Sequence, residues 1–217
     1  MTTIYGLQNG QKAALLISEC QRSMTDPVDA TIAALNQQVN ERGILPKISA
    51  LAQACRESGV PVIHCTIVAM KDFRGFSVNC LLAKGVVRGN ELVEGNPKAE
   101  IAPELKPQAG DIVSQRCHGM TGFHGTELES ILRGFGVETV ILAGVSTNIA
   151  LPGMSTEAVN RGFNVVIAED CTAGGTAESH AFQIKNHLPF LATISHSAAI
   201  IKVLKSQPQA LLQSVPK

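Results

Sequence analysis

The chain has 217 residues, and its 18 Lys and Arg balance 18 Asp and Glu, so the formal net charge is zero. This balance argues against a nucleic-acid partner, because phosphate backbones select basic surfaces. Hydrophobic residues account for 45% and charged residues for 17%, which is typical of globular proteins. The apolar runs are much shorter than the roughly 20 residues of a membrane span, and the first residues lack a signal-peptide pattern. We therefore expect one cytoplasmic domain over residues 1–217, with no membrane contact.

Apolar runs alternate with segments of helical periodicity along the chain. Strands are predicted over residues 13–18, 61–67, 112–114, 139–144, 165–168 and 192–195. Helices are predicted over residues 29–40, 45–58, 126–135, 150–161, 177–188 and 198–205, and residues 69–107 are expected to form a long irregular loop. This alternation predicts an α/β protein with a doubly wound, mainly parallel six-stranded sheet and helices on both faces, a Rossmann-like three-layer α/β/α arrangement.

A sheet of this kind binds its ligand beyond the carboxyl ends of the strands, where the strand order reverses. The residues at the predicted strand ends are therefore the first candidates for a site: Glu19, Thr66, Arg116, Cys117, His118, Ser146, Thr147, Asn148, Asp170 and Cys171. They bring an acid, a cation and a helix start to one edge of the sheet.

Cysteine is unusually frequent in the sequence, which has six: Cys20, Cys55, Cys65, Cys80, Cys117 and Cys171. No two of them form a C-x-x-C pair, and their scatter does not predict a zinc site. Most are expected to be small buried residues, while one acting as a nucleophile is the alternative.

Three motifs lie in a fixed order along the chain. They are LLISECQ at 15–21, GMTGFHGTELESILRGFGVETVILAG at 119–144 and GVSTNIALPGMSTEAVNRGFNVVIAEDCTAG at 144–174. Together they resemble the isochorismatase-like hydrolase superfamily, also called cysteine hydrolases. The resemblance covers most of the chain and implies the same α/β fold, a small-molecule substrate, no cofactor and a homo-oligomer of two or more subunits.

Family enzymes of the hydrolytic type use a carboxylate, a lysine and a cysteine. By resemblance the carboxylate falls on Glu19. A gapless count back from Phe123 puts the lysine position on Cys117, next to Arg116, and the nucleophile position falls on Ala150. Because alanine cannot attack a carbonyl, the ordinary thioester mechanism is not available at that position.

Three functions stay open at this point. In the first, a hydrolase cleaves an enol ether, amide or ester of a small metabolite by acid–base chemistry from Glu19. Arg116 then positions the substrate, and the Ile149 and Ala150 backbone N–H groups bind an anion. In the second, catalysis is lost and the scaffold only binds a small molecule or serves an assembly. In the third, Cys117 is a relocated nucleophile, activated by neighbouring Arg116.

Further candidates surround this set. Arg74 could clamp a substrate carboxylate or be a solvated loop charge, and Phe123 is expected to pack under the turn that follows residue 114. His118, Ser146, Thr147 and Ile149 complete the predicted substrate-binding residues, although Thr147 and Asn148 are first of all candidates to cap the following helix. The remaining histidines lack ligand spacing, so no metal is expected, and His64 is predicted to be a core residue. Asp170 is expected to orient a turn by side-chain hydrogen bonds. The resemblance also implies a cis peptide at 145–146.

Overall fold

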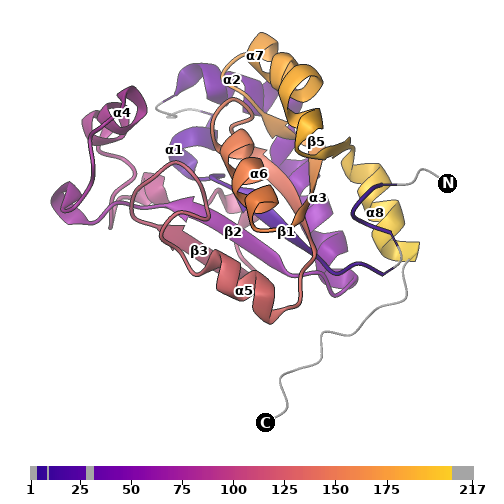
Figure 1. The fold of residues 1–217 in the computed structure, drawn as a ribbon. Helices are drawn as coiled ribbons and strands as arrows, with labels where there is room; N and C mark the ends of the chain where they lie inside the picture. The colour runs from indigo at the N-terminus through magenta and orange to yellow at the C-terminus, as the bar shows by residue number, and fades with distance from the viewer. Residues whose placement is uncertain (1–3, 9, 28–31, 207–217) are drawn as a thin grey trace.

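The computed structural model describes residues 4–8, 10–27 and 32–206. Six strands form one sheet in the order β3-β2-β1-β4-β5-β6, and all neighbouring strands are parallel. Helices pack on both faces of this sheet (Figure 1), which confirms the predicted doubly wound α/β fold. The strands are β1 (Ala13–Ser18), β2 (Val62–Ile67), β3 (Ile112–Arg116), β4 (Thr139–Val145), β5 (Asn164–Ala173) and β6 (Thr193–Ser195).

Most helices lie where hydrophobic periodicity predicts them. They are α1 (Arg22–Thr25), α2 (Ala33–Arg42), α3 (Ile44–Glu57), α4 (Leu81–Gly89), α5 (Leu128–Gly134), α6 (Ala150–Asn160), α7 (Ala177–Phe182) and α8 (Ser197–Ser206). The first predicted helix begins at residues 29–31, which lie outside the described residues. The helix predicted to run to residue 188 ends at Phe182 and continues as a wider π-helical turn, Gln183–His187.

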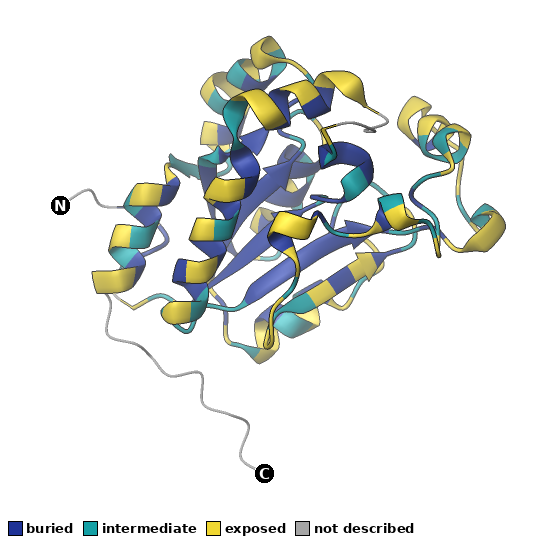
Figure 2. Ribbon diagram, turned by 180° about the vertical axis from the view of Figure 1, so that it is seen from behind, coloured by how far each residue is buried: buried dark blue, intermediate teal, exposed yellow. Residues whose placement is uncertain are grey.

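Strand β1 is buried on both sides, because successive side chains of a strand point to opposite faces of the sheet. Ile17 packs in one core cluster with Ile48 of α3, whereas the preceding Leu16 packs in the other with Leu132 of α5. The strands are accordingly the most buried part of the molecule (Figure 2). Because each face of the sheet packs against its own core, the strands are apolar at nearly every position in the sequence.

Residues 69–107 contain regular structure that the sequence analysis did not predict. Helix α4 stands away from the sheet (Figures 1 and 2), and the exposed fraction of Leu81 at its start is 85%. Two glycines, Gly85 inside the helix and Gly89 at its end, lower the helix propensity of this segment. Backbone hydrogen bonds close the base of this segment, from Ala69 N to Leu92 O and from Glu94 N to Ala69 O.

The sheet reverses its order between β1 and β4, which pair along their whole length. At the end of β4 a Cβ on Gly144 would lie 2.2 Å from the Ser18 carbonyl oxygen, and its φ is 98°. Only glycine therefore allows the two strand ends to approach this closely. The approach brings the turn after β4 beside the residue that follows β1, Glu19. None of the helices in the described ranges has the length and apolar character to traverse a bilayer.

Candidate active site

A cavity of about 270 Å³ lies beyond the carboxyl ends of the strands, at the point where the strand order reverses. Its four polar lining side chains come from three places in the sequence: Glu19 after β1, Arg116 at the end of β3, and Ser146 and Asn148 after β4. The rest of its wall is mainly apolar. The strand-end rule applied to the sequence therefore found the right edge of the sheet.

Glu19 terminates β1 in an unusual conformation. Its φ is 49°, in the left-handed region that side chains other than glycine rarely adopt, and its N–H donates to the Cys65 carbonyl oxygen at 2.9 Å. Such backbone geometry costs about 1–3 kcal/mol and is found at functional sites. Here the turn directs the carboxylate toward Arg116 rather than along the strand.

Gln21 holds this turn in place. Its side chain is buried, donates to the carbonyl oxygens of Ile67 at 2.9 Å and Ala99 at 2.6 Å, and accepts from the Ile67 N–H at 2.9 Å. The amide thus ties β1 to the end of β2. Gln21 belongs to the first sequence motif, but its structural partners are far away in the chain, so its role was not predicted.

Arg116 is the cation of the site. Only 3% of the residue is exposed; its Nη2 forms an ion pair with Glu19 Oε1, and its Nε donates to the Gly119 carbonyl oxygen at 3.3 Å. The remaining nitrogen, Nη1, is buried and has no hydrogen-bond partner among the described residues. A buried donor of this kind is costly unless something accepts its hydrogen bond. Arg116 lines the cavity, so a turn of its guanidinium would bring this buried nitrogen to a ligand oxygen there.

Cys117 does not occupy the place of the family lysine that the gapless count gave it. The residue facing Glu19 is Arg116, one position earlier. Cys117 is half-buried and is not part of the cavity wall. The correction is one residue, but adjacent residues at a strand end point in opposite directions, so that single step exchanges a thiol for a guanidinium.

The turn after β4 supplies the other side of the cavity. The Val145–Ser146 peptide bond is cis, at the position the resemblance implied. Ile149 lines the cavity, and its N–H makes only a long hydrogen bond of 3.3 Å to the Ser146 carbonyl oxygen. Ala150 is the first residue of the eleven-residue helix α6. The start of a helix favours negative charge, so these N–H groups suit an anionic oxygen.

Thr147 and Asn148 do not cap α6, contrary to the expectation from the sequence. The residue before the helix is Ile149, and no side chain caps it. Asn148 Oδ1 accepts from the Gly175 N–H at 2.9 Å, and Thr147 Oγ1 lies 3.1 Å from His180 Nδ1. Both side chains are used to fasten the turn to the segment after β5, which lies close enough to compete with the helix for them.

Thr147 is fully buried and belongs to a chain of polar contacts. His180 Nε2 lies 3.1 Å from Glu169 Oε1, and Arg42 Nη2 lies 2.6 Å from the same oxygen. Burial lowers the pKa of His180, and its hydrogen bond with Glu169 opposes this only in part. Burial alone would raise the pKa of Glu169, but hydrogen bonds from His180 and Arg42 outweigh it and hold that pKa below its ordinary value. Neutral His180 then donates from Nε2 and accepts from Thr147.

Glycine at position 174 makes room for this chain of contacts, because a Cβ there would lie 2.6 Å from Thr147 Oγ1. His180 and Glu169 were not predicted as part of the site. The one signal in the sequence was the position of Glu169 next to Asp170 in the third motif, and His180 has no sequence pattern that points to Thr147.

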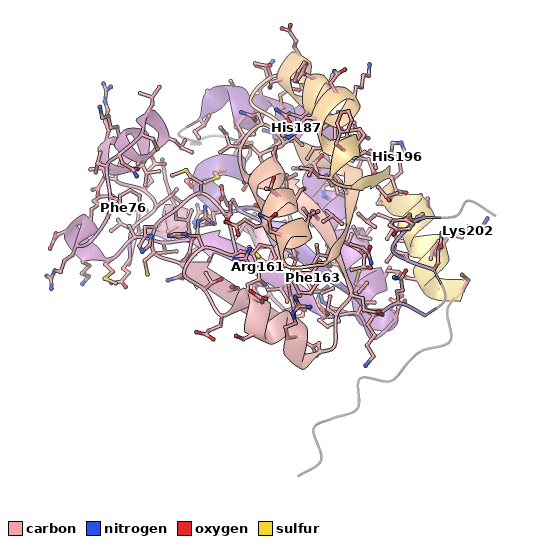
Figure 3. The ribbon with its side chains drawn as sticks, in the orientation of Figure 1. Phe76, Arg161, Phe163, His187, His196 and Lys202 are labelled. Carbon is pink, nitrogen blue, oxygen red and sulfur yellow. The ribbon has the colours of Figure 1, made fainter. Side chains whose placement is uncertain are left out.

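Four predicted substrate-binding residues lie outside the cavity wall: Thr147, which makes the contacts described above, Arg74, His118 and Phe123. Arg74 is exposed, and exposed His118 contacts the ring of His124 with centroids 5.1 Å apart. Phe123 is buried and stacks on Phe163, with centroids 6.4 Å apart, under the guanidinium of Arg161 (Figure 3 labels Phe163 and Arg161). Phe123 therefore packs as the sequence indicated. The structure brings together Glu19, Arg116, Ser146 and Ile149, but not these four.

The buried cysteines are poor nucleophile candidates. Burial raises the pKa of Cys65 to about 12 and that of Cys171 to about 12, and burial also raises the pKa of Cys20. A thiol must ionise to attack, so these side chains stay protonated at neutral pH. They fill space in the two cores, as the sequence analysis expected for most of the cysteines.

Two further polar residues, His64 and Asp170, make contacts that stabilise the fold. His64 is a buried core residue whose Nε2 lies 3.4 Å from Asp111 Oδ2, and burial lowers its pKa. Asp170 accepts hydrogen bonds from Ser197 N at 2.7 Å and Ser197 Oγ at 2.6 Å, so it fastens the start of α8 rather than a turn of its own. Within the described ranges, no group of three or more His, Cys, Asp or Glu side chains could hold a metal ion.

Several apolar residues complete the wall; Phe76 lies on the loop that the resemblance implied at the mouth of the pocket, and the others were not predicted. Phe76 comes from the segment that leads to α4 (Figure 3), Leu82 and Val86 come from α4, and Met120 follows β3. They are brought together only by the tertiary fold, and no motif connects them.

One protein family accounts for the similarities of this chain. A family model described as the isochorismatase domain matches residues 13–199. The maleamate amidohydrolase of Pseudomonas putida is 28% identical over 176 residues, 79% of this chain and 76% of that enzyme. The isochorismatase family protein YecD of Escherichia coli O157:H7 is 39% identical over 82 residues, 38% of this chain and 44% of YecD. A solved cysteine hydrolase from Pseudomonas syringae pv. phaseolicola superposes with a TM-score of 0.82 at 22% identity, covering 95% of this chain and 99% of the other. The chain belongs to the isochorismatase family.

Proposed function

We propose that this protein hydrolyses an amide, or a chemically similar ester or enol ether, of a small metabolite without a cysteine nucleophile. The observation that carries the proposal is the buried Glu19–Arg116 pair, which lines an open cavity beside the start of α6. A crevice filled with side chains would leave no room for a substrate. Similar proteins named as amidohydrolases, of maleamate and of ureidoacrylate, favour an amide.

Water takes the place of the missing thiol in this mechanism. Glu19 accepts a proton from a water molecule as it attacks the carbonyl carbon, and the carbonyl oxygen becomes an oxyanion. The free Nη1 of Arg116 and the N–H groups at the start of α6 stabilise this charge. When the tetrahedral intermediate collapses, Glu19 returns the proton to the leaving nitrogen. Arginine keeps its proton throughout, so Glu19 is the only group of the pair that transfers one.

An enol ether would use the same residues in a different order. Glu19 would first donate a proton to the double bond, and water would then add to the resulting cation. This chemistry needs no oxyanion site, so the buried donor of Arg116 would serve only to hold the substrate. The unused Nη1 therefore favours carbonyl hydrolysis.

Two further functions use other parts of the site. A protein that only binds a small molecule would keep the cavity and lose turnover. A relocated nucleophile at Cys117 would require the turn after β3 to move, since Cys117 is not in the cavity wall.

The test is a substrate screen with two matched variants. We expect the purified protein to hydrolyse one or more primary amides, carbamoyl compounds, esters or isochorismate. Glu19→Gln should lower kcat by about 100-fold or more, because a positioned acid–base group contributes that much. Cys117→Ser should keep full activity.

Each alternative has its own result in the same screen. Ligand binding without turnover of any compound would establish the binding function instead. Activity that survives Glu19→Gln but is lost in Cys117→Ser would establish the relocated thiol.

A further inference from the structure

The cavity beside Glu19 does not end at the polar residues. A second cavity, of about 520 Å³, adjoins it under α4 and shares six of its wall residues. These are Met24, Ile32, Leu82, Val86, Leu92 and Ile149. All six are apolar, and they come from four separate stretches of the chain. The two cavities thus lie side by side along a shared apolar wall, and the first of them has a polar end at Glu19 and Arg116.

The charges along this space are already balanced. Among the described residues, Arg116 is the one cation in the wall of the first cavity. It already forms an ion pair with Glu19. In the second cavity the charged residue of the wall is Glu91, whose Oε1 pairs with Lys98 at 2.8 Å. A ligand with a carboxylate at its far end would therefore place that carboxylate near Glu91, and the wall offers no unpaired cation to neutralise it. Such a charge is costly to bury without a partner.

One hydrogen-bond donor remains unused at the polar end of the first cavity. Arg116 Nη1 is buried without an acceptor among the described residues, which calls for an oxygen on the ligand. At the other end, Ser23 and Glu91 lie in the wall of the second cavity. Their buried atoms Ser23 Oγ and Glu91 Oε2 have no hydrogen-bond partner among the described residues, and both can accept a hydrogen bond. The far end of a ligand can therefore be apolar or a neutral donor, but not an anion.

We propose that the ligand is an uncharged amphipathic amide whose carbonyl head lies between Glu19 and Arg116 and whose apolar body, several carbons long, lies under α4. The proposal rests on the proposed function for the identity of the head group. It differs from the substrate named for the Pseudomonas putida relative, because maleamate carries a carboxylate at its far end.

A second copy of the chain is the competing occupant of this space. Leu81 is 85% exposed at the start of α4 and could contact another subunit. The observation that favours a ligand is the position of the shared wall: Met24 and Leu92 are buried below α4 and line the cavity that holds Glu19 and Arg116, whereas a subunit packed on the exposed side of α4 would not contact them.

The first experiment measures binding along a series of primary amides. Acetamide, butanamide and hexanamide are titrated against the purified protein by calorimetry, with release of ammonia measured in parallel. Each added methylene should lower Kd about fourfold, as expected when its surface leaves water. Adipamate, which has the hexanamide chain with a terminal carboxylate, should bind at least about tenfold more weakly than hexanamide.

The second experiment changes the wall. Leu82 lines both cavities and is 40% exposed, whereas Val78, exposed to 47%, lines neither. Leu82→Ser should weaken hexanamide about tenfold more than it weakens acetamide, and Val78→Ser should change neither. Sedimentation of each variant gives its oligomeric state.

The outcomes separate this inference from the proposed function. Tight binding of hexanamide without ammonia release would remove the hydrolase and keep the ligand class. Turnover of short amides with no gain along the series, or preference for adipamate, would keep the hydrolase and overturn the ligand class. Equal weakening of all amides by Leu82→Ser together with dissociation of an oligomer would assign α4 to a subunit contact and also overturn it.

Discussion

Arg116 with Glu19 and Arg42 with Glu169 are two arginine–carboxylate pairs toward the carboxyl ends of the strands, and they differ in whether water reaches the guanidinium. Arg42 donates to Glu169 Oε1 and to the carbonyl oxygens of Glu169 and Thr172, and its side chain is 25% exposed, so water can reach it. Arg116 is 3% exposed and keeps one nitrogen without a partner in the described part of the chain.

The difference separates fastening from binding. The Arg42 pair joins α2 to β5 and, through His180, to the turn that carries Thr147. The Arg116 pair faces a cavity and retains a donor for something that enters it. A pair that is partly open to water holds the fold, whereas a buried pair with an unpaired nitrogen beside a cavity marks a candidate site.

Removing the buried cation should give the largest effect. Arg116→Met leaves Glu19, whose side chain is only 12% exposed, without its partner, so we expect the unfolding free energy to fall by about 3–5 kcal/mol. Urea denaturation measures the change. The double variant Glu19→Gln, Arg116→Met should recover much of this stability without activity. If the single variant were as stable as the native protein, the pair would not be buried as described.

The equivalent change at the fastening pair should be smaller and should not reach the chemistry. Arg42→Met removes hydrogen bonds from a partly solvated guanidinium, and we expect a loss of about 1–3 kcal/mol in the unfolding free energy. Steady-state kinetics on a substrate found in the screen should show kcat nearly unchanged. A loss of kcat comparable to that of Glu19→Gln would mean that the two clusters are not functionally separate.

The fastening cluster should also make stability depend on pH. Burial lowers the pKa of His180, and of His64, below the ordinary 6.5. The unfolded chain therefore binds more protons than the folded chain as pH falls below 6.5, and the unfolding free energy should decrease there. The groups facing His180 and Glu169 are Arg42 and His196, and the low pKa of Glu169 adds a further loss only at more acidic pH.

Variants can assign this pH dependence. Unfolding free energies measured at pH 7.5, 6.5 and 5.5 should show a smaller decline in His180→Gln than in the native protein. His187→Gln is the matched control, because His187 is exposed on the following turn (Figure 3). An unchanged slope in His180→Gln would place the titration elsewhere.

The smallest expected effect concerns the contact between Asp170 and Ser197. It lies at the carboxyl ends of the strands but belongs to neither arginine–carboxylate pair. Asp170→Ala removes the two hydrogen bonds that fasten the start of α8 at Ser197, and should cost about 1 kcal/mol. Thermal unfolding measures it. Lys202→Ala, on the exposed side of the same helix (Figure 3), should change the melting temperature little.

Much of the fold followed from local pattern. The predicted bounds of β1 match the structure, and β4 differs by one residue, because both strands are central and apolar throughout. Helix α4 was missed because it is short and contains glycines, which lower helix propensity, within a long segment rich in glycine and proline. The third motif correctly located the turn after β4, but the partners of Thr147 and Asn148 lie more than 25 residues away, and local capping rules could not anticipate them.

The sequence by itself determined the layered sheet, the edge where the site lies, and the presence of Glu19 there, since each depends on apolar alternation and on strand ends. The tertiary structure alone decided that Arg116 rather than Cys117 faces Glu19, because side-chain direction at a strand end changes with every residue. It also decided that Phe76, Leu82 and Met120 wall the cavity. Burial left Arg116 with an unsatisfied donor, a property that depends on everything packed around it and on no single stretch of sequence.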